Sequence, residues 1–312
     1  MSELSQLKDL SHRAYEHPSG RAALAAVRRG PKAITKIVDL VGARRMRTIY
    51  LAGALRISDK QLPEVWAVFE ECCRLLDLLP PELYVSRDPG GHTGALGTDE
   101  PFIVLSAATL KLFEAHPSEL RFLLGREIGH VLSGHSVYNS ALGLLLRTRT
   151  TAASVPVLGL AVHGGIAVLK DWNDDAALSA DRAGLLCAQD VEACREYFTK
   201  MAGGEWAEID EEAFLAQEDD YRESKGALDT VVKLISSSTV DSPRYVLRYS
   251  ELRQWIDSGE YGRILGGDYA RRSQDDAASF KEEAGVTWSH LKSKVRGKTS
   301  AVSSLFRRRG ER

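Results

Sequence analysis

The chain has 312 residues, of which 44% are hydrophobic and 27% are charged, the balance of an ordinary globular protein with enough apolar residues for a core. Its formal net charge of −2 gives no overall positive field, so we expect no nucleic-acid partner. The four cysteines form no C-x-x-C pair, and two of them are the neighbours Cys72 and Cys73. This pattern favours a reduced, cytoplasmic chain over a disulfide-linked secreted one.

The first part of the chain, residues 1–80, is predicted to be a helical region that packs on the core of the protein. Turn signals interrupt it at residues 17–20 and 29–32. Residues Gln61–Leu78 fit an amphipathic helix, which a pair of prolines closes.

Residues 81–267 are predicted to form the main domain. It begins with two short strands, Glu82–Ser86 and Phe102–Ser106, separated by a glycine-rich loop at 89–97. The segment His-Pro-Ser-Glu-Leu that follows is typical of a helix start, with Ser118 as a candidate N-cap. Further helices are expected over Ala176–Gln189, Glu211–Ser224, Ala227–Ile235 and Val246–Ile256.

An uncharged stretch of eighteen residues, Ala152–Leu169, just reaches the length of a membrane span. It contains Pro156, His163 and three glycines, however, and is rich in alanine. We therefore expect a buried helix or helical hairpin beside the helix that carries the site. The alternative interpretation is an element that dips into a membrane.

The last stretch, residues 268–312, loses its periodicity and is predicted to be a largely disordered tail. Residues Lys292–Arg312 hold eight basic residues against one glutamate. A solvated basic end is the first interpretation. The second is an electrostatic contact with an anionic membrane or an acidic partner, which would make the protein membrane-peripheral.

The segment Glu119–His135, ELRFLLGREIGHVLSGH, resembles the active-site helix of the HtpX-like and CAAX prenyl protease family of zinc metallopeptidases. The family pattern there is H-E-x-x-H. Two histidines four residues apart on a helix point within about 40° of each other, so both reach one zinc ion. The glutamate between them is the general base that takes a proton from the zinc-bound water. The third ligand in this family is a glutamate on a later helix, in the pattern E-x-x-A-D.

This sequence departs from the family pattern at two of the three ligand positions. Arg126 stands at the first histidine, Glu127 at the general base and His130 at the second histidine. The later helix reads ALSADRAGLL, where Asp181 matches the aspartate of the pattern and Ala177 stands at the ligand glutamate. The resemblance therefore implies a vestigial general base, Glu127, and a single surviving ligand position, His130.

An ion pair between Arg126 and Asp181 is a specific prediction of this resemblance. In the family the aspartate lies behind the metal and orients the first histidine. An arginine in the histidine's place would meet that aspartate, would also reach Glu127, and would supply the positive charge that zinc supplies elsewhere. The alternative is that Arg126 points to solvent.

The resemblance also implies substrate-side residues. The loop HTGALG at 92–97, together with the strand that includes Phe102, Ile103 and Val104, resembles the family's substrate-side edge strand. Ser242 stands where the family often has a histidine before proline, and Arg248 matches the arginine that follows it.

Other residues are poor candidates for rebuilding a metal site. On a continuous helix, His135 would lie about 140° around from His130, so the two could not bind one ion from the same face. Asp174 could share a helix face with Ala177, and Asp175 lies beside it. With His130, such an oxygen ligand would give two ligands, which is short of a tight zinc site.

The predicted fold is α+β and mainly helical: a zincin-like metallopeptidase fold with a small β-sheet and a central active-site helix. The predicted function is that of a pseudopeptidase, which has lost zinc and proteolysis and holds a peptide or protein partner in the former substrate cleft. No cofactor is expected. Two alternatives stay open: an active zinc metalloendopeptidase with an atypical site, and a membrane-peripheral interaction module.

Overall fold

The structure is a computed structural model of the 312-residue chain. It describes residues 4–20, 43–88, 93–97, 100–152, 156–204, 209–223 and 244–275. The predicted helix Ala227–Ile235, residue Ser242 and the basic stretch Lys292–Arg312 lie outside the described residues.

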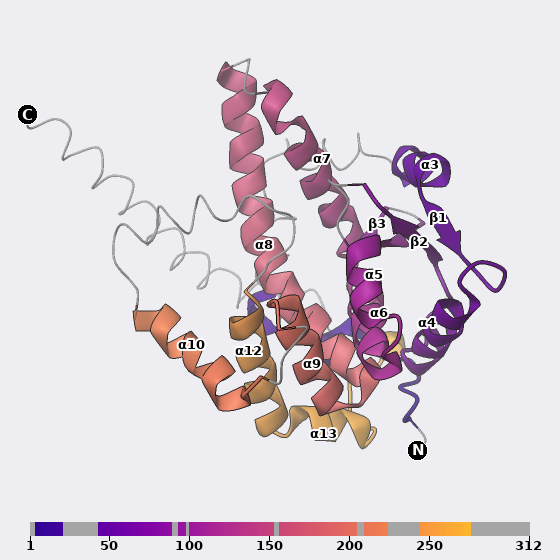
Figure 1. The fold of residues 1–312 in the computed structure, drawn as a ribbon, viewed down its shortest axis with the longest axis vertical. Helices are drawn as coiled ribbons and strands as arrows, with labels where there is room; N and C mark the ends of the chain where they lie inside the picture. The colour runs from indigo at the N-terminus through magenta and orange to yellow at the C-terminus, as the bar shows by residue number, and fades with distance from the viewer. Residues whose placement is uncertain are drawn as a thin grey trace, which may run out of the picture.

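The sheet has four strands in the described part of the chain, in the order β1-β2-β4-β3 (Figure 1). They are β1 (Leu55–Ile57), β2 (Glu82–Ser86), β3 (Gly94–Leu96) and β4 (Phe102–Ser106). Strands β2 and β4 are parallel, and the two outer pairings are antiparallel. The sequence predicted β2 and β4 with these bounds, whereas β1 and β3 were not predicted, and β3 lies in the stretch that was assigned to a loop.

Strand β4 lies inside the sheet, and this corrects the prediction that it is the substrate-side edge. Strand β2 pairs with one side of β4 and β3 with the other, with Ala95 opposite Ile103. Phe102 and Val104 pack beneath Tyr50 of helix α3, while Ile103 faces the main core. Both faces of β4 are therefore buried, and the strand that could accept a peptide at this side of the sheet is β3.

The rest of the described secondary structure is helical, and several of the helices lie away from the sheet (Figure 1). The described helices are α3 (Ala43–Gly53), α4 (Pro63–Leu75), α5 (Ala107–Phe113), α6 (Pro117–Leu132), α7 (Ser136–Ala152), α8 (Pro156–Ala188), α9 (Val191–Met201), α10 (Glu211–Glu223), α12 (Tyr245–Asp257) and α13 (Glu260–Leu265), with 3-10 turns at His12–Ala14 and Arg272–Gln274. The mainly helical α+β fold is thus confirmed. Helix α6 begins at Pro117 with His116 as its N-cap, so Ser118 lies within the first turn instead of capping it.

Helices α7 and α8 form a hairpin that extends beyond the rest of the helices (Figure 1). The uncharged stretch Ala152–Leu169 covers the end of α7, the connection and the first part of α8. Leu169 is fully buried, in a small core with Leu142 and Trp172. Among the described residues, no helix combines the length and hydropathy that crossing a membrane requires.

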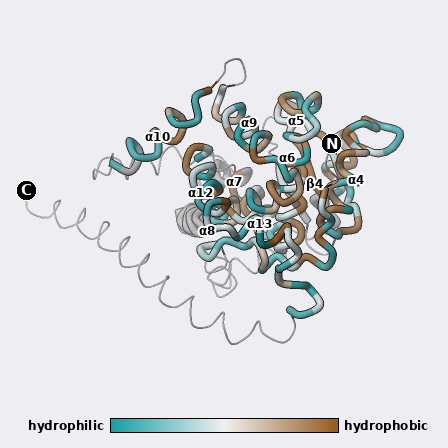
Figure 2. The backbone as a smooth tube through the Cα atoms, turned by 90° about the horizontal axis from the view of Figure 1, so that it is seen from below, coloured by the Kyte–Doolittle hydropathy of each residue, from teal (hydrophilic) through white to brown (hydrophobic). Residues whose placement is uncertain are grey.

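The main core lies between the inner face of the sheet and helices α4, α6, α8, α9 and α12. Hydrophobic positions gather around α4, α6 and β4 in Figure 2. Helix α6 packs against α8 through small residues. A Cβ atom added at Gly125 would lie 2.4 Å from Cys187 Cβ, and one added at Gly129 would lie 2.4 Å from Ala183 Cβ. Only glycine allows this approach, which places the predicted site residues of α6 directly against α8.

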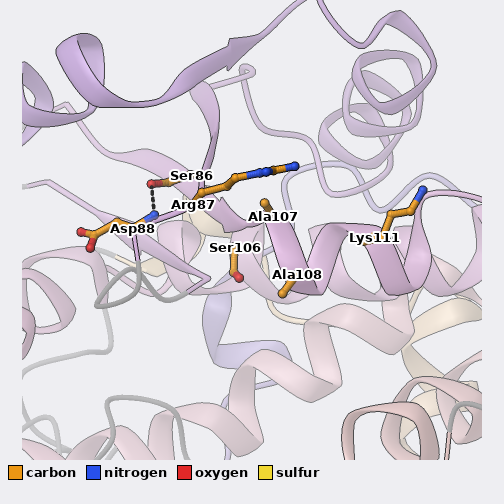
Figure 3. A pocket seen from close by; sticks show the side chains of 7 residues that line it. All are labelled: Ser86, Arg87, Asp88, Ser106, Ala107, Ala108 and Lys111. Carbon is orange, nitrogen blue, oxygen red and sulfur yellow. Dashed lines mark hydrogen bonds between the residues drawn. The ribbon is translucent and has the colours of Figure 1, made fainter.

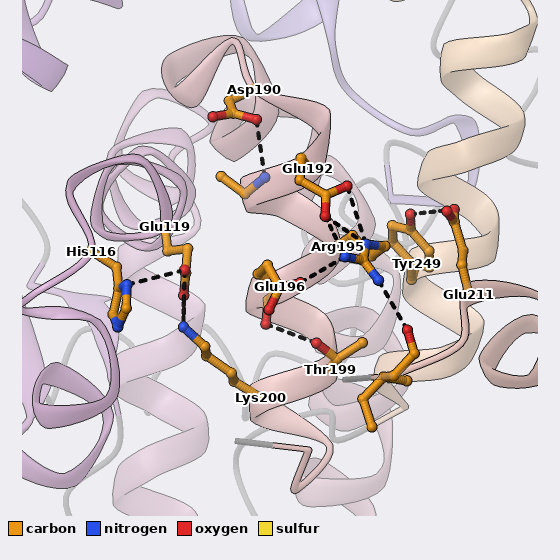
Figure 4. Close-up of polar contacts among 12 residues, drawn as sticks. His116, Glu119, Asp190, Glu192, Arg195, Glu196, Thr199, Lys200, Glu211 and Tyr249 are labelled. Carbon is orange, nitrogen blue, oxygen red and sulfur yellow. Dashed lines mark hydrogen bonds and ion pairs between the residues drawn. The ribbon is translucent and has the colours of Figure 1, made fainter. Parts of the chain in front are cut away.

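Ion pairs fasten the start of α6 to α9. Lys200 Nζ donates to both carboxylate oxygens of Glu119, at 2.9 and 2.7 Å, and His116 lies on the other side of that carboxylate (Figure 4). Further along, Tyr249 of α12 donates to Glu211 of α10 at 2.6 Å. The first contact fixes α6 relative to α9, and the second fixes α12 relative to α10.

The two ends of the described chain pack together. Leu10 and Arg271 form an isolated antiparallel bridge, and Ser11 Oγ donates to both oxygens of Asp275. Residues 268–275 of the stretch assigned to a disordered tail are therefore folded onto the N-terminal segment. That segment reaches the site helix, because the hydroxyl of Tyr15 donates to Gly129 O at 3.3 Å.

Candidate functional site

The predicted site residues come together between α6 and α8. Helix α6 supplies Arg126, Glu127 and His130, and α8 supplies Asp181 and Ala177. All five are buried. Helices α6 and α8 approach as closely as their glycines allow, which leaves no room for a layer of water between them. The charged side chains must therefore form hydrogen bonds and ion pairs with one another.

Arg126 forms the predicted ion pair with Asp181. Its Nε donates to Asp181 Oδ1 at 2.6 Å, and its Nη1 lies 3.6 Å from Glu127 Oε1. The same Nη1 donates to the hydroxyl of Tyr197 at 3.0 Å. Arg126 is 8% exposed, so the alternative in which it points to solvent is wrong.

Arg248 supplies a second cation that the sequence did not predict for this position. Its Nε donates to Asp181 Oδ2 at 2.8 Å and its Nη2 to Asp181 Oδ1 at 2.6 Å. The resemblance implied a substrate-side role for Arg248, but the side chain is buried and its guanidinium is bound to the aspartate on α8. The cluster thus holds two guanidiniums, of Arg126 and Arg248, against the two carboxylates of Asp181 and Glu127.

Both arginines keep their charge in this buried cluster. Burial acts to lower the pKa of Arg126, but Tyr197, Asp181 and Glu127 act more strongly in the opposite direction and raise it above the ordinary value. For Arg248, burial again lowers the pKa, and Asp181 reverses the effect. A buried charge is stable only when it is paired and hydrogen-bonded, as both guanidiniums are here.

His130 and His135 are in direct contact, which corrects the prediction that they lie on different faces of one helix. Their Nδ1 atoms are 3.0 Å apart. The helix ends at Leu132, and Gly134 adopts the left-handed conformation with φ of +68°. His135 N then donates to His130 O at 2.9 Å, so the chain folds back and places the second imidazole on the first.

His130 is neutral in these surroundings. Burial is the largest effect that lowers its pKa well below the ordinary value, and His135, Arg126 and Arg248 act in the same direction. One imidazole of the contact between His130 and His135 therefore donates and the other accepts.

The donor set at the family's metal position does not fit zinc. A structural or catalytic zinc site takes at least three protein ligands, and here the first position holds a guanidinium and the third, Ala177, a methyl group. Asp174 is turned to another partner, since its carboxylate pairs with Arg244 at 2.8 Å and is 34% exposed. In the described ranges, no group of three or more histidine, cysteine, aspartate or glutamate side chains is arranged to hold a metal ion.

A surface pocket of about 580 Å³ lies elsewhere, where the parallel strands β2 and β4 end (Figure 3). It is lined by Ser86, Arg87, Asp88, Ser106, Ala107, Ala108 and Lys111. None of the residues implied by the metallopeptidase motifs lines it. The buried cluster and this pocket are thus separate features.

Comparisons with known proteins agree with the motif and the fold. The chain is 28% identical over 268 residues to plastoglobule-localized metallopeptidase 48, chloroplastic, of Arabidopsis thaliana, which covers 83% of this chain and 76% of that protein. It is 22% identical over 126 residues to a protease HtpX homolog of Streptococcus gordonii, covering 40% and 42% of the two chains. No solved structure matches. Residues 60–256, more than half of the chain, match Peptidase family M48, and the chain therefore belongs to that family.

Proposed function

We propose that this protein is a member of peptidase family M48 that binds polypeptides without zinc and without cleaving them. The observation that carries the proposal is the guanidinium of Arg126, which stands at the first ligand position and bonds to Asp181 at 2.6 Å. An arginine side chain does not deprotonate in a protein. A dication about 4 Å away would be repelled by roughly 8 kcal/mol at an effective dielectric constant of about 20.

The charge balance of the cluster supports the same proposal. A site emptied of zinc would leave the carboxylates of Glu127 and Asp181 buried without a cation, which costs several kcal/mol for each charge. In this chain Arg126 supplies a positive charge at the first ligand position, and Arg248 adds a second one at Asp181. Both carboxylates therefore have a cation beside them without a metal ion.

The sheet supports a polypeptide as the partner. An extended peptide can add to an exposed sheet edge through main-chain hydrogen bonds. Strand β3 lies at an edge of the sheet, whereas β4, where Phe102, Ile103 and Val104 lie, is inside it. The partner would be an extended segment of a peptide or protein.

An active zinc metalloendopeptidase is the competing proposal. Glu127 and His130 keep the family's general base and second ligand, and both relatives are named as peptidases. A membrane-peripheral role is a further alternative, and the name of the Arabidopsis relative, which places that protein at plastoglobules, is the observation that favours it. Co-sedimentation with anionic vesicles that is lost on removal of residues 292–312 would support it.

The experiment that tests the proposal is a measurement of bound metal. The protein would be purified without chelator, incubated with one equivalent of zinc, desalted, and analysed by native mass spectrometry and by elemental analysis. We expect a folded chain with substoichiometric zinc and no hydrolysis of casein. About one zinc per chain retained against desalting, together with casein hydrolysis that a chelator stops, would overturn the proposal.

A further inference from the structure

The outer edge of β3 is already occupied by helix α7. Asn139 Nδ2 donates to Ala95 O at 3.2 Å, and Gly97 N donates to Ser140 Oγ at 2.9 Å. Ala95 and Ser140 are fully buried, and Asn139 nearly so. Figure 1 shows α7 running beside β3. Two of the main-chain groups on the side of β3 that faces away from β4 therefore have partners on the same helix.

These two bonds reproduce the pattern of strand addition. In a parallel pair of strands, one residue of the added strand lies opposite one residue of the edge strand. Its N–H donates to the carbonyl of the residue that precedes this opposite residue, and its carbonyl accepts from the N–H of the residue that follows it. Around Leu96, Asn139 provides the donor and Ser140 the acceptor. Ser140 Oγ in turn donates to Ser136 O at 2.8 Å, which leaves a lone pair for Gly97 N. The side chains of Asn139 and Ser140 thus form the two hydrogen bonds that one residue of an added peptide would form.

The contact between α7 and β3 is incompletely satisfied. Asn139 Oδ1 is buried without a hydrogen-bond partner in the part of the chain that the structure describes. A buried acceptor without a partner costs free energy, whereas the same acceptor meets water or a peptide N–H once the helix turn moves. The contact therefore protects the edge against aggregation but is weaker than a continuous ladder.

We infer that the first turns of α7 are a built-in competitor for the peptide-binding edge, and that an extended polypeptide binds at β3 by displacing Asn139 and Ser140. This inference rests on the proposed polypeptide-binding function and names its surface and its regulation. When a peptide binds to the wild-type chain, the two hydrogen bonds from β3 to Asn139 and Ser140 are lost and two hydrogen bonds to the peptide form. In a variant without these two side chains, the bonds to the peptide form and none is lost.

The test is the affinity for fluorescein-labelled β-casein, an unstructured polypeptide, measured by fluorescence anisotropy in EDTA so that no metal-dependent cleavage interferes. The variant is N139A/S140A. The matched control is Y138F, which removes a polar group from the same helix on the face that packs against Trp172 at a ring distance of 5.2 Å. We expect the double variant to bind at least tenfold more tightly than wild type, equivalent to about 1.4 kcal/mol, with the control unchanged.

A folded double variant that binds casein no more tightly than wild type, or does not bind it, overturns the inference. So does an equal gain in Y138F, which would indicate a general loosening of α7. If circular dichroism shows that the double variant does not fold, S140A alone, which removes the acceptor of Gly97 N, is judged by the same comparison. The readout does not depend on zinc content, so failure here is distinguishable from failure of the proposal that the protein holds no zinc.

Discussion

Arg126 and Asp181 lie on two helices packed at glycine distance, and a hydrogen bond of 2.6 Å joins the guanidinium Nε of one to the carboxylate Oδ1 of the other. The pair lies at the centre of the contact between α6 and α8. In an active metallopeptidase with the motif that this sequence resembles, the metal ion links these two helices. In this chain the ion pair links them, and its contribution to stability can be measured.

The first prediction concerns that contribution. R126M should lower the free energy of unfolding by about 3–5 kcal/mol, because it removes one buried cation from the carboxylates of Asp181 and Glu127. D181N should cost at least as much, since it leaves the guanidiniums of Arg126 and Arg248 facing each other. Urea denaturation followed by circular dichroism measures both changes.

The control for this prediction is K111M, which removes an ion pair to Glu114 from a lysine side chain that is 79% exposed. It should change the free energy of unfolding by less than about 1 kcal/mol. If R126M proves as mild as K111M, the buried cluster does not stabilise the fold, and the proposal that Arg126 takes the place of zinc is wrong.

A second prediction concerns the two family ligand positions that hold Arg126 and Ala177 in this chain. The double variant R126H/A177E restores the three-ligand pattern with His130, and we expect it to retain about one zinc per chain after desalting. R126H alone supplies two ligands and should retain little. Zinc should also raise the thermal unfolding temperature of the double variant and leave that of wild type unchanged. Equal zinc content in wild type and double variant would contradict the prediction.

More of the site than of the sheet could be predicted from the sequence. Strands β2 and β4 could be predicted because each is a short apolar run bounded by turn residues. Strand β3 could not, since it has three residues and includes Gly94, and only pairing with β4 makes it a strand. Without β3, the interior strand β4 was taken for an edge.

Two residues, Arg248 and His135, lie elsewhere than predicted, and each difference has a physical reason. Arg248 lies 67 residues from Asp181 in the chain, and only the packing of α12 beside α8 brings its guanidinium to that carboxylate. For His135 a signal was present. Gly134 comes two residues after Leu132, the last residue of the apolar stripe, and a glycine at that position commonly ends a helix in the left-handed conformation. A predicted helix end at this glycine would have turned the chain back and placed His135 on His130.

A third prediction tests that turn. At Gly134 an added Cβ would meet nothing within 4 Å, so G134A strains only the backbone, at φ of +68°. We expect a loss of roughly 1–2 kcal/mol in the free energy of unfolding. Gly143, inside α7, is equally open, but a glycine there is helical, so G143A should be neutral or stabilise by up to about 1 kcal/mol. Equal effects at the two positions would rule out strain at Gly134.

The last prediction concerns pH and a histidine outside the cluster. His17 Nδ1 lies 2.6 Å from Ser19 Oγ, and its Nε2 lies 3.8 Å from Glu251. Burial is the largest effect that lowers the pKa of His17, to about 4, with Arg182 acting in the same direction and Asp175 opposing it. The native state thus keeps this imidazole neutral at pH values where the unfolded chain, with a histidine pKa of about 6.5, is protonated.

The sign follows from the number of bound protons. Between about pH 6.5 and 4 the unfolded state binds more protons at this position than the native state, so stability falls as the pH is lowered through that window. We expect H17Q to lose less stability than wild type between pH 7.5 and pH 5 in urea denaturation. H116Q, at a side chain that is 53% exposed, controls for the loss of a histidine as such. If H17Q and wild type lose the same amount while H116Q also matches them, His17 titrates alike in both states and its burial has no effect on the pH dependence.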